Sequence, residues 1–266
     1  MQHTRPPAVA GFFYPASAAQ LRRDVNDYLA GVEPAAAGAV PKVLIAPHAG
    51  YVYSGPIAAS AYARIGAGSG TVKRVVLLGP AHRVHVHGMA LPAASQFETP
   101  LGSIEIDQDA VAVVKDLPQV VISDEAHAQE HSLEVHLPFL QQVLGSFKLV
   151  PFAVGSATAQ QVAQVLDLLW GGDETLIVIS SDLSHYLPYP RACATDEFTV
   201  ETILRLQPNL DHRQACGATP INGLLLTARA RALKPHLLDL RNSGDTAGDK
   251  SRVVGYASLE FHEHAD

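Results

Sequence analysis

Residues 74–82 read RVVLLGPAH, a short unbroken apolar run that ends in a glycine, a proline and a histidine. The pattern returns in VLIAPH over residues 43–48 and in LIVISSDLSH over residues 176–185. Apolar runs without alternating polar residues predict strands that are buried on both faces, as in a parallel sheet covered by helices. Ligands bind at the carboxyl edge of such sheets. We therefore expect the three histidines that end these runs to lie close together.

Helical and strand patterns alternate along the rest of the chain, and Ser17 is a candidate N-cap for the first helix. This alternation predicts an α/β fold, with a single three-layer α/β/α domain over residues 1–266 and a largely parallel central sheet. A loop is expected over residues 31–41. The other expected elements are helices over residues 18–30, 56–65, 107–117, 130–144, 159–170, 191–206 and 220–233, and strands over residues 89–91, 103–106, 147–152 and 252–261. In the helix over residues 130–144, Pro138 marks either the entry or a kink.

The composition excludes several classes of protein. The chain has 266 residues, of which 47% are hydrophobic, enough for a substantial core. A formal net charge of -7 is unlike the basic surface of a nucleic-acid-binding protein. Two cysteines make no disulfide framework. The sequence has neither the apolar region of a signal peptide nor an apolar stretch of about 20 residues. We expect a cytoplasmic protein that binds no nucleic acid and no membrane.

His48 and His82 each follow a predicted strand and stand beside glycine and proline, which let the chain turn sharply. Each alone is equally compatible with a loop histidine that bonds to the backbone. Together, two imidazoles at neighbouring strand ends indicate a metal site that suits Fe(II), Cu or Zn. His85 and His87 alternate with valines, which predicts a strand with one polar face, and we leave both outside the site.

Asp182 and His185 follow the third buried run. An aspartate three residues before a histidine, in a tight turn, can orient the imidazole and fix its tautomer. His185 held in this way is a candidate general base. The alternative interpretation is that Ser181 or Asp182 caps the start of a helix.

Residues 130–138 read EHSLEVHLP and are rich in potential ligands. His131 and His136 are five residues apart, so on one helix their side chains diverge by about 140°. This spacing differs from that of the zincin motif, which needs histidines four apart. We select His131 as the catalytic candidate. Glu134 and His136 are equally consistent with hydrogen-bonded residues at the start of a helix.

A polar loop, NSGDTAGD over residues 242–249, precedes the last predicted strand. Its aspartates can be turn formers or can supply a carboxylate ligand. Cys216 can line the cleft or be a buried structural thiol. The sequence has no Walker loop, no G-x-G-x-x-G and no G-x-S-x-G motif, which disfavours nucleotide binding and serine-hydrolase chemistry.

Four segments follow one another along the chain: APHAGY, LGPAH, EHSLEVHLP and SSDLSH, at residues 46–51, 78–82, 130–138 and 180–185. Together, and in this order, they resemble the Memo family, whose bacterial and archaeal members are called AmmeMemoRadiSam system protein B. The resemblance implies a fold related to the class III extradiol dioxygenases. In that superfamily two histidines and a carboxylate hold non-haem Fe(II), and a further histidine transfers protons.

The resemblance implies that His48 and His82 are metal ligands and that His185, beside Asp182, is the further active-site histidine. In the human member the third ligand is a cysteine in the loop before the last strand, and this chain has none there. We expect Asp245 in that role, with Asp249 as the reserve. A thiolate favours Cu(I) or Zn, whereas two imidazoles and a carboxylate suit Fe(II). Fe(II) is therefore the expected cofactor, with Cu or Zn as alternatives.

Three functions follow as hypotheses. The first is a non-haem iron, dioxygenase-like redox enzyme that acts on a small molecule. The second is a metal-dependent hydrolase, because a bound metal lowers the pKa of water. The third is a non-catalytic protein that binds a metal, a peptide or a protein partner. The resemblance implies radical-SAM and AMMECR-like proteins as such partners.

Overall fold

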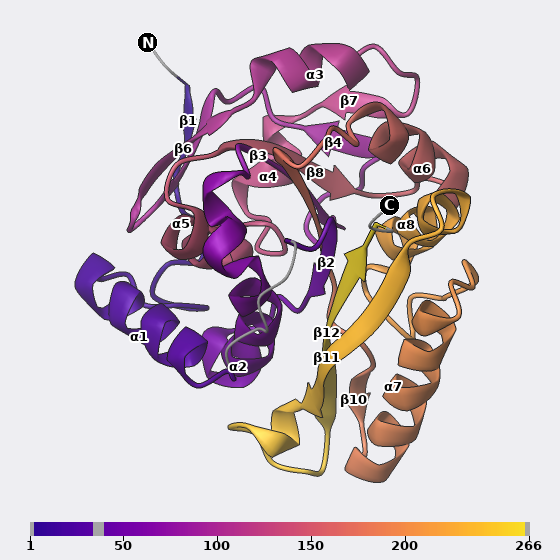
Figure 1. Cartoon of the computed structure of the whole chain (residues 1–266). Helices are drawn as coiled ribbons and strands as arrows, with labels where there is room; N and C mark the ends of the chain where they lie inside the picture. Colours follow the sequence, from indigo (N-terminus) through magenta and orange to yellow (C-terminus); the bar gives the residue numbers. More distant parts are fainter. Residues whose placement is uncertain (1–2, 34–39, 264–266) are drawn as a thin grey trace.

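The computed structural model describes residues 3–33 and 40–263, and within them twelve strands form one mixed sheet (Figure 1). Part of the loop expected over residues 31–41 therefore lies outside the described residues. Five parallel strands form the centre of the sheet. In spatial order they are β6 (Gly102–Ile106), β8 (Lys148–Val154), β3 (Arg74–Pro80), β9 (Thr175–Ser180) and β2 (Val43–Ala46). The predicted α/β class is confirmed, and the three runs that lead to histidines are neighbouring strands.

Antiparallel strands flank this centre on both sides. β12 (Val253–His262) pairs with β2, and also with β10 (His185–Leu187) and β11 (Lys234–Asn242). On the other side β5 (Gln96–Thr99) pairs with β6, and β4 (Met89–Leu91) pairs with β8. The short strands β1 (Thr4–Arg5) and β7 (Val120–Ile122) pair in parallel with β5 and β4.

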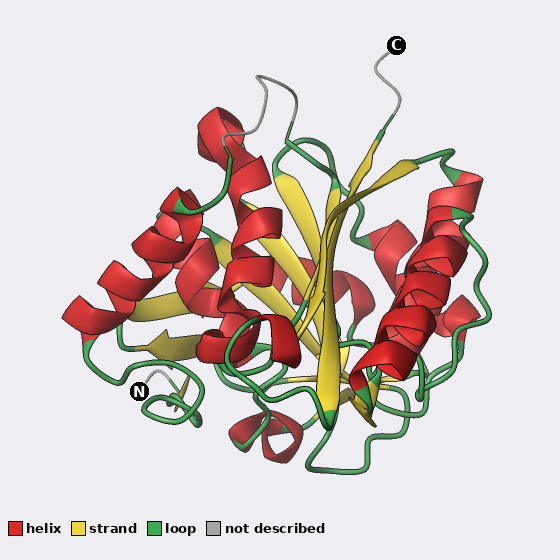
Figure 2. Cartoon of the chain, turned by 90° about the horizontal axis from the view of Figure 1, so that it is seen from below, coloured by secondary structure: helices red, strands yellow, loops and turns green. Residues whose placement is uncertain are grey.

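Helices cover both faces of the sheet, which gives three layers (Figure 2). None of the described helices has the length and apolar character needed to cross a membrane. One face carries α1 (Ala18–Ala30), α2 (Tyr51–Tyr62) and α5 (Leu137–Leu144), and the other carries α6 (Ala159–Leu168), α7 (Tyr189–Leu204) and α8 (Ala218–Ala230). The shorter α3 (Gln108–Val114) and α4 (Asp124–Ala128) follow β6 and β7.

Three local predictions differ from the structure. Within the helical candidate over residues 130–144, Pro138 marks the entry of α5 and stands in its first turn, where a missing N–H is tolerated, whereas residues 130–133 form an irregular turn. The strand expected at His85 and His87 is an exposed loop in which the two rings pack with centroids 4.5 Å apart. Helix α2 begins five residues before the expected position 56.

Candidate metal centre

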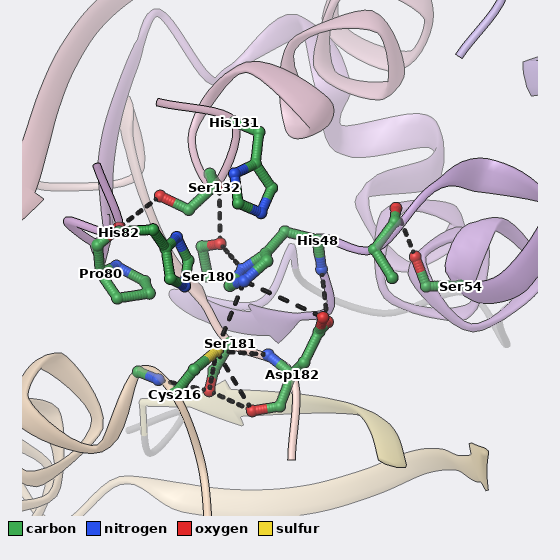
Figure 3. Close-up of polar contacts among 12 residues, drawn as sticks. His48, Ser54, Pro80, His82, His131, Ser132, Ser180, Ser181, Asp182 and Cys216 are labelled. Carbon is green, nitrogen blue, oxygen red and sulfur yellow. Dashed lines mark hydrogen bonds and ion pairs between the residues drawn. The ribbon is translucent and has the colours of Figure 1, made fainter. Parts of the chain in front are cut away.

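Three imidazoles converge at the carboxyl edge of the parallel strands (Figure 3). His48 follows β2, His82 follows β3, and His131 comes from the turn that precedes α5. One ring nitrogen from each of the three lies within 4.8 Å of the other two. The ring centroids of His82 and His131 are 4.7 Å apart, and each is within 5.4 Å of the His48 centroid. We call these three residues the three-histidine centre.

The ring of His48 is fixed by a chain of hydrogen bonds. Its Nδ1 lies 2.6 Å from Oγ of Ser180, which itself donates to the carbonyl oxygen of Ser132. Oγ of Ser180 therefore accepts a hydrogen bond from Nδ1–H of His48, and Nε2 keeps its lone pair. Burial, reinforced by the neighbouring histidines, lowers the pKa of His48 well below its usual value. The ring is neutral at pH 7, as metal ligation requires.

His82 is held by a buried carboxylate. Oε1 of Glu130 lies 2.9 Å from Nδ1 of His82, and Oε2 accepts the backbone N–H of the same residue. Oε1 also accepts the backbone N–H groups of His131 and Ser132. Burial raises the pKa of Glu130, but the hydrogen bonds from His82 and the backbone outweigh it and hold the pKa at about 2. The ionised carboxylate fixes the tautomer of His82 and leaves Nε2 to the centre.

The ring of His131 packs between His82 and Phe13, with centroids 4.7 Å from each. Its Nδ1 is buried and has no hydrogen-bond partner among the described residues, although Oε1 of Glu130 is 3.3 Å away. Burial lowers the pKa of His131 to about 4, so this ring is also neutral at pH 7. Neutral imidazoles, one with an orphaned buried nitrogen, fit a transition metal of the class Zn, Cu, Fe or Ni.

Gly79 allows the turn at residues 130–133 to approach strand β3. A Cβ atom at this position would lie 2.8 Å from Oγ of Ser132 and 3.1 Å from Cβ of Ser180. With glycine at position 79, Oγ of Ser132 donates a hydrogen bond to the carbonyl oxygen of Pro80 at 2.8 Å. The close approach places His131 beside the two strand-end histidines.

Asp182 and His185 lie beside the centre but do not bond to each other as expected. Oδ1 of Asp182 accepts the backbone N–H of His48 at 2.8 Å, and burial raises the pKa of Asp182 to about 6. His185 instead donates from Nδ1 to the carbonyl oxygen of Leu183 at 2.8 Å. This backbone contact orients the exposed ring and leaves Nε2 free to accept a proton.

The structure places Asp245 outside the three-histidine centre. Its carboxylate accepts hydrogen bonds from the hydroxyl of Tyr189 and the backbone N–H of Asn242, and it caps a turn. Asp249 bonds to Ser251 and lines a cavity next to His131.

Two further residues at the centre were not selected from the sequence. Sγ of Cys216 lies 3.4 Å from Nε2 of His48, and burial raises the pKa of this thiol to about 12. Glu130 stood next to the selected His131, but its role depends on the contact with His82. A carboxylate directly before a candidate ligand was the only sequence signal for it.

Glu134 and His136 are buried and form hydrogen bonds with residues outside the three-histidine centre. The Glu134 carboxylate accepts hydrogen bonds from Arg5, from Tyr14 and from two backbone N–H groups of the N-terminal segment. Nδ1 of His136 lies 2.7 Å from the hydroxyl of Tyr62. The hydrogen bonds of Glu134 and of His136 are those of structural residues.

Comparisons with known proteins show the family to which the chain belongs. Residues 5–260 match the family model described as "Memo-like protein". A "MEMO1 family protein" of Sulfolobus acidocaldarius is 35% identical over 97% of this chain and 99% of its own length. One from Aquifex aeolicus is 37% identical over 97% of this chain and 98% of its own length. An uncharacterized protein of Escherichia coli K12 shares the fold at 16% identity, with a TM-score of 0.50 over 81% of this chain and 98% of its own. The chain belongs to the Memo family.

Proposed function

We propose that this protein binds a transition metal through His48, His82 and His131 and acts as a non-haem Fe(II), dioxygenase-like redox enzyme. The observation that carries the metal site is the convergence of three imidazoles, with the Nδ1 atoms of two of them already bonded to Ser180 and Glu130. Fe(II) is the first choice because the family resemblance implies it, and imidazole is a suitable ligand for it.

A bound Fe(II) would supply open coordination positions and redox chemistry. The protein's own residues would supply orientation and proton transfer. His185 lines a cavity beside the centre, and its Nδ1 donates to the carbonyl oxygen of Leu183, so Nε2 would accept a proton from a substrate hydroxyl. Asp182 fixes the backbone of His48 through Oδ1 and so keeps that ring in position.

A second candidate is a metal-dependent hydrolase. Three histidines with an open position also form the ligand set of catalytic zinc sites, in which the metal lowers the pKa of bound water. His185 would then serve as the base that assists attack by water. The two candidates differ in the preferred metal and in their requirement for O2.

The test is anaerobic titration of the metal-free protein with Fe(II), Zn(II) and Cu(II), with His48→Ala and His82→Ala as variants. The redox proposal is supported if the wild type binds Fe(II) stoichiometrically, both variants lose this binding, and the Fe(II)-loaded protein takes up O2. Preference for Zn(II) without O2 uptake favours the hydrolase. Absence of specific metal binding by the wild type would contradict both and favour a protein that binds a partner such as a radical-SAM or AMMECR-like protein.

A further inference from the structure

Two cavities adjoin the three-histidine centre and share His185 as a lining residue. The larger has a volume of about 680 Å³ and is also lined by His82 and Cys216, so it reaches the centre. Its outer wall is formed by Arg191 and Thr195 from the start of α7 and by the turn at residues 211–214. A molecule that fills this cavity would therefore touch both the centre and α7.

The larger cavity is positively charged, although the whole chain carries a formal net charge of -7. Arg191 and Arg213 line it together with a single carboxylate, Asp211. That carboxylate pairs with Arg213 at 3.0 Å and also accepts the backbone N–H groups of Arg213 and Gln214. Across residues 3–33 and 40–263, no carboxylate lies within ion-pair distance of Arg191. The uncompensated charge of the cavity is therefore that of Arg191.

The surroundings of Arg191 add to this preference for an anion. Arg191 is the third residue of α7, and the first turn of this sixteen-residue helix contains no acidic side chain. The positive end of the helix dipole therefore lies at the cavity wall. Thr195, His212 and Gln214 offer further hydrogen-bonding groups. A planar guanidinium among such groups matches the oxygen atoms of a carboxylate or phosphate.

The smaller cavity, of about 450 Å³, differs in charge and in lining. Asp182 and Asp249 stand there beside one arginine, Arg252, whose guanidinium lies over the ring of Tyr186 at 5.2 Å from its centroid. Aromatic side chains form much of its wall, namely Phe13, Tyr53, Tyr186 and Tyr256. The two carboxyl groups make this cavity unfavourable for an anion, which leaves the larger cavity as the place for one.

We propose that the substrate is a small organic anion whose carboxylate or phosphate group binds Arg191 while its reacting part lies at the three-histidine centre. The role of the bound molecule as a substrate rests on the proposed function. The binding of the anion does not, because the charge of Arg191 is independent of any metal.

The test is titration of the metal-free protein with inorganic phosphate and, separately, with acetate, at constant ionic strength. Binding is followed by the backbone amide chemical shifts of α7. Arg191→Gln should weaken the binding of the preferred anion about tenfold or more, because a hydrogen bond to a charged group is lost. Arg191→Lys should keep part of the affinity. The matched control is Arg205→Gln, at the residue that directly follows the end of α7, whose side chain pairs with Glu201 at 3.2 Å.

Tighter binding of phosphate or of acetate identifies which of the two groups the cavity prefers. Equal affinities of wild type and Arg191→Gln for both anions would overturn the proposal, as would an equal loss in Arg205→Gln. Anion binding by a protein that takes up no metal would leave the anion site standing while contradicting the proposed function. Metal binding without Arg191-dependent anion binding would contradict the anion site while leaving the proposed function standing.

Discussion

Oε1 of Glu130 lies 2.9 Å from Nδ1 of His82, and Oε2 of the same carboxylate accepts the backbone N–H of His82. One buried, ionised side chain thus fixes both the ring and the backbone of a strand-end histidine. Through the backbone N–H of His131 it also fixes the turn that carries the third imidazole. Glu130 therefore links two of the three histidines before any metal binds.

Replacing Glu130 with Gln should weaken metal binding while the fold persists. An amide oxygen is a poorer acceptor for the Nδ1 proton of His82 than a carboxylate, and loss of such supporting contacts commonly lowers metal affinity about 10- to 100-fold. Competition titration against a chelator measures the change. Glu125→Gln, at an exposed position in α4, is the control and should keep wild-type affinity. Unchanged affinity in Glu130→Gln would show that His82 needs no such partner.

The identity of the third ligand can be decided by two substitutions. His131→Ala should reduce metal affinity by at least as much as His82→Ala, because its nitrogen lies within the 4.8 Å group. Asp245→Asn should leave metal affinity unchanged, because the Asp245 carboxylate is bonded to Tyr189 and Asn242. Metal analysis of the purified variants gives the answer. If only Asp245→Asn lost the metal, Asp245 would be the third ligand, as expected from the sequence.

A methyl group at Gly79 should disturb both stability and the centre. Its Cβ would lie 2.8 Å from Oγ of Ser132, so the turn at residues 130–133 would have to move. Overpacking of this kind costs about 1–3 kcal/mol. Gly79→Ala should therefore unfold at lower urea concentration and bind metal more weakly. Gly70→Ala, where nothing lies within 4 Å of the added Cβ, is the control. If Gly79→Ala had the stability and the metal affinity of the wild type, the turn would tolerate the displacement.

The centre of the sheet could be predicted because β2, β3 and β9 are almost wholly buried, and buried strands leave an unbroken apolar run in the sequence. His48 and His82 followed from the same pattern, since neighbouring parallel strands end at one edge. Strand β11 was missed because most of its residues are exposed or half-buried, so its sequence has no comparable run.

The third imidazole could not be placed from local patterns. The 140° divergence of His131 and His136 holds only on a continuous helix, whereas His131 lies in an irregular turn whose position depends on contact with Gly79. That contact joins residues more than fifty positions apart, and no spacing rule encodes it. Likewise, the partner of His185 is the carbonyl oxygen of Leu183, which every residue type offers.

Acid should destabilise the protein partly through His127. Burial lowers the pKa of this histidine from its usual 6.5 to about 4, so between these values the unfolded chain binds a proton that the folded chain does not. The free energy of unfolding therefore falls with falling pH, by about 1.4 kcal/mol per pH unit for this one group. Asp182 and Asp196, whose pKa burial raises to about 6, act in the opposite direction.

The contribution of His127 is isolated by comparing urea unfolding of wild type and His127→Gln from pH 7 to pH 4. The difference between their free energies of unfolding should shrink as the pH falls through this range. His85→Gln, in an exposed loop, should parallel the wild type throughout. A constant difference between wild type and His127→Gln would mean that His127 titrates alike in the folded and unfolded chains.

The Glu134 carboxylate should anchor the N-terminal segment and, through it, the metal centre. It is fully buried, pairs with Arg5, and accepts the backbone N–H groups of Ala8 and Val9 at 2.8 and 3.0 Å. Glu134→Gln leaves the buried guanidinium without its counter-charge, which costs about 3–5 kcal/mol. Because Phe13 packs on the ring of His131, the loosened segment should also weaken metal binding.

Urea unfolding and hydrogen exchange at Ala8 and Val9 measure these effects. Arg5→Met should destabilise to a similar degree. The double variant Arg5→Met with Glu134→Gln should cost clearly less than the sum of the two, because neither charge is then left buried without its partner. Additive costs would show that the pair is not coupled. If the hydrogen-exchange rates at Ala8 and Val9 were unchanged in Glu134→Gln, other contacts would anchor the N-terminal segment. The packing of Phe13 on His131 is the one of these contacts nearest the centre.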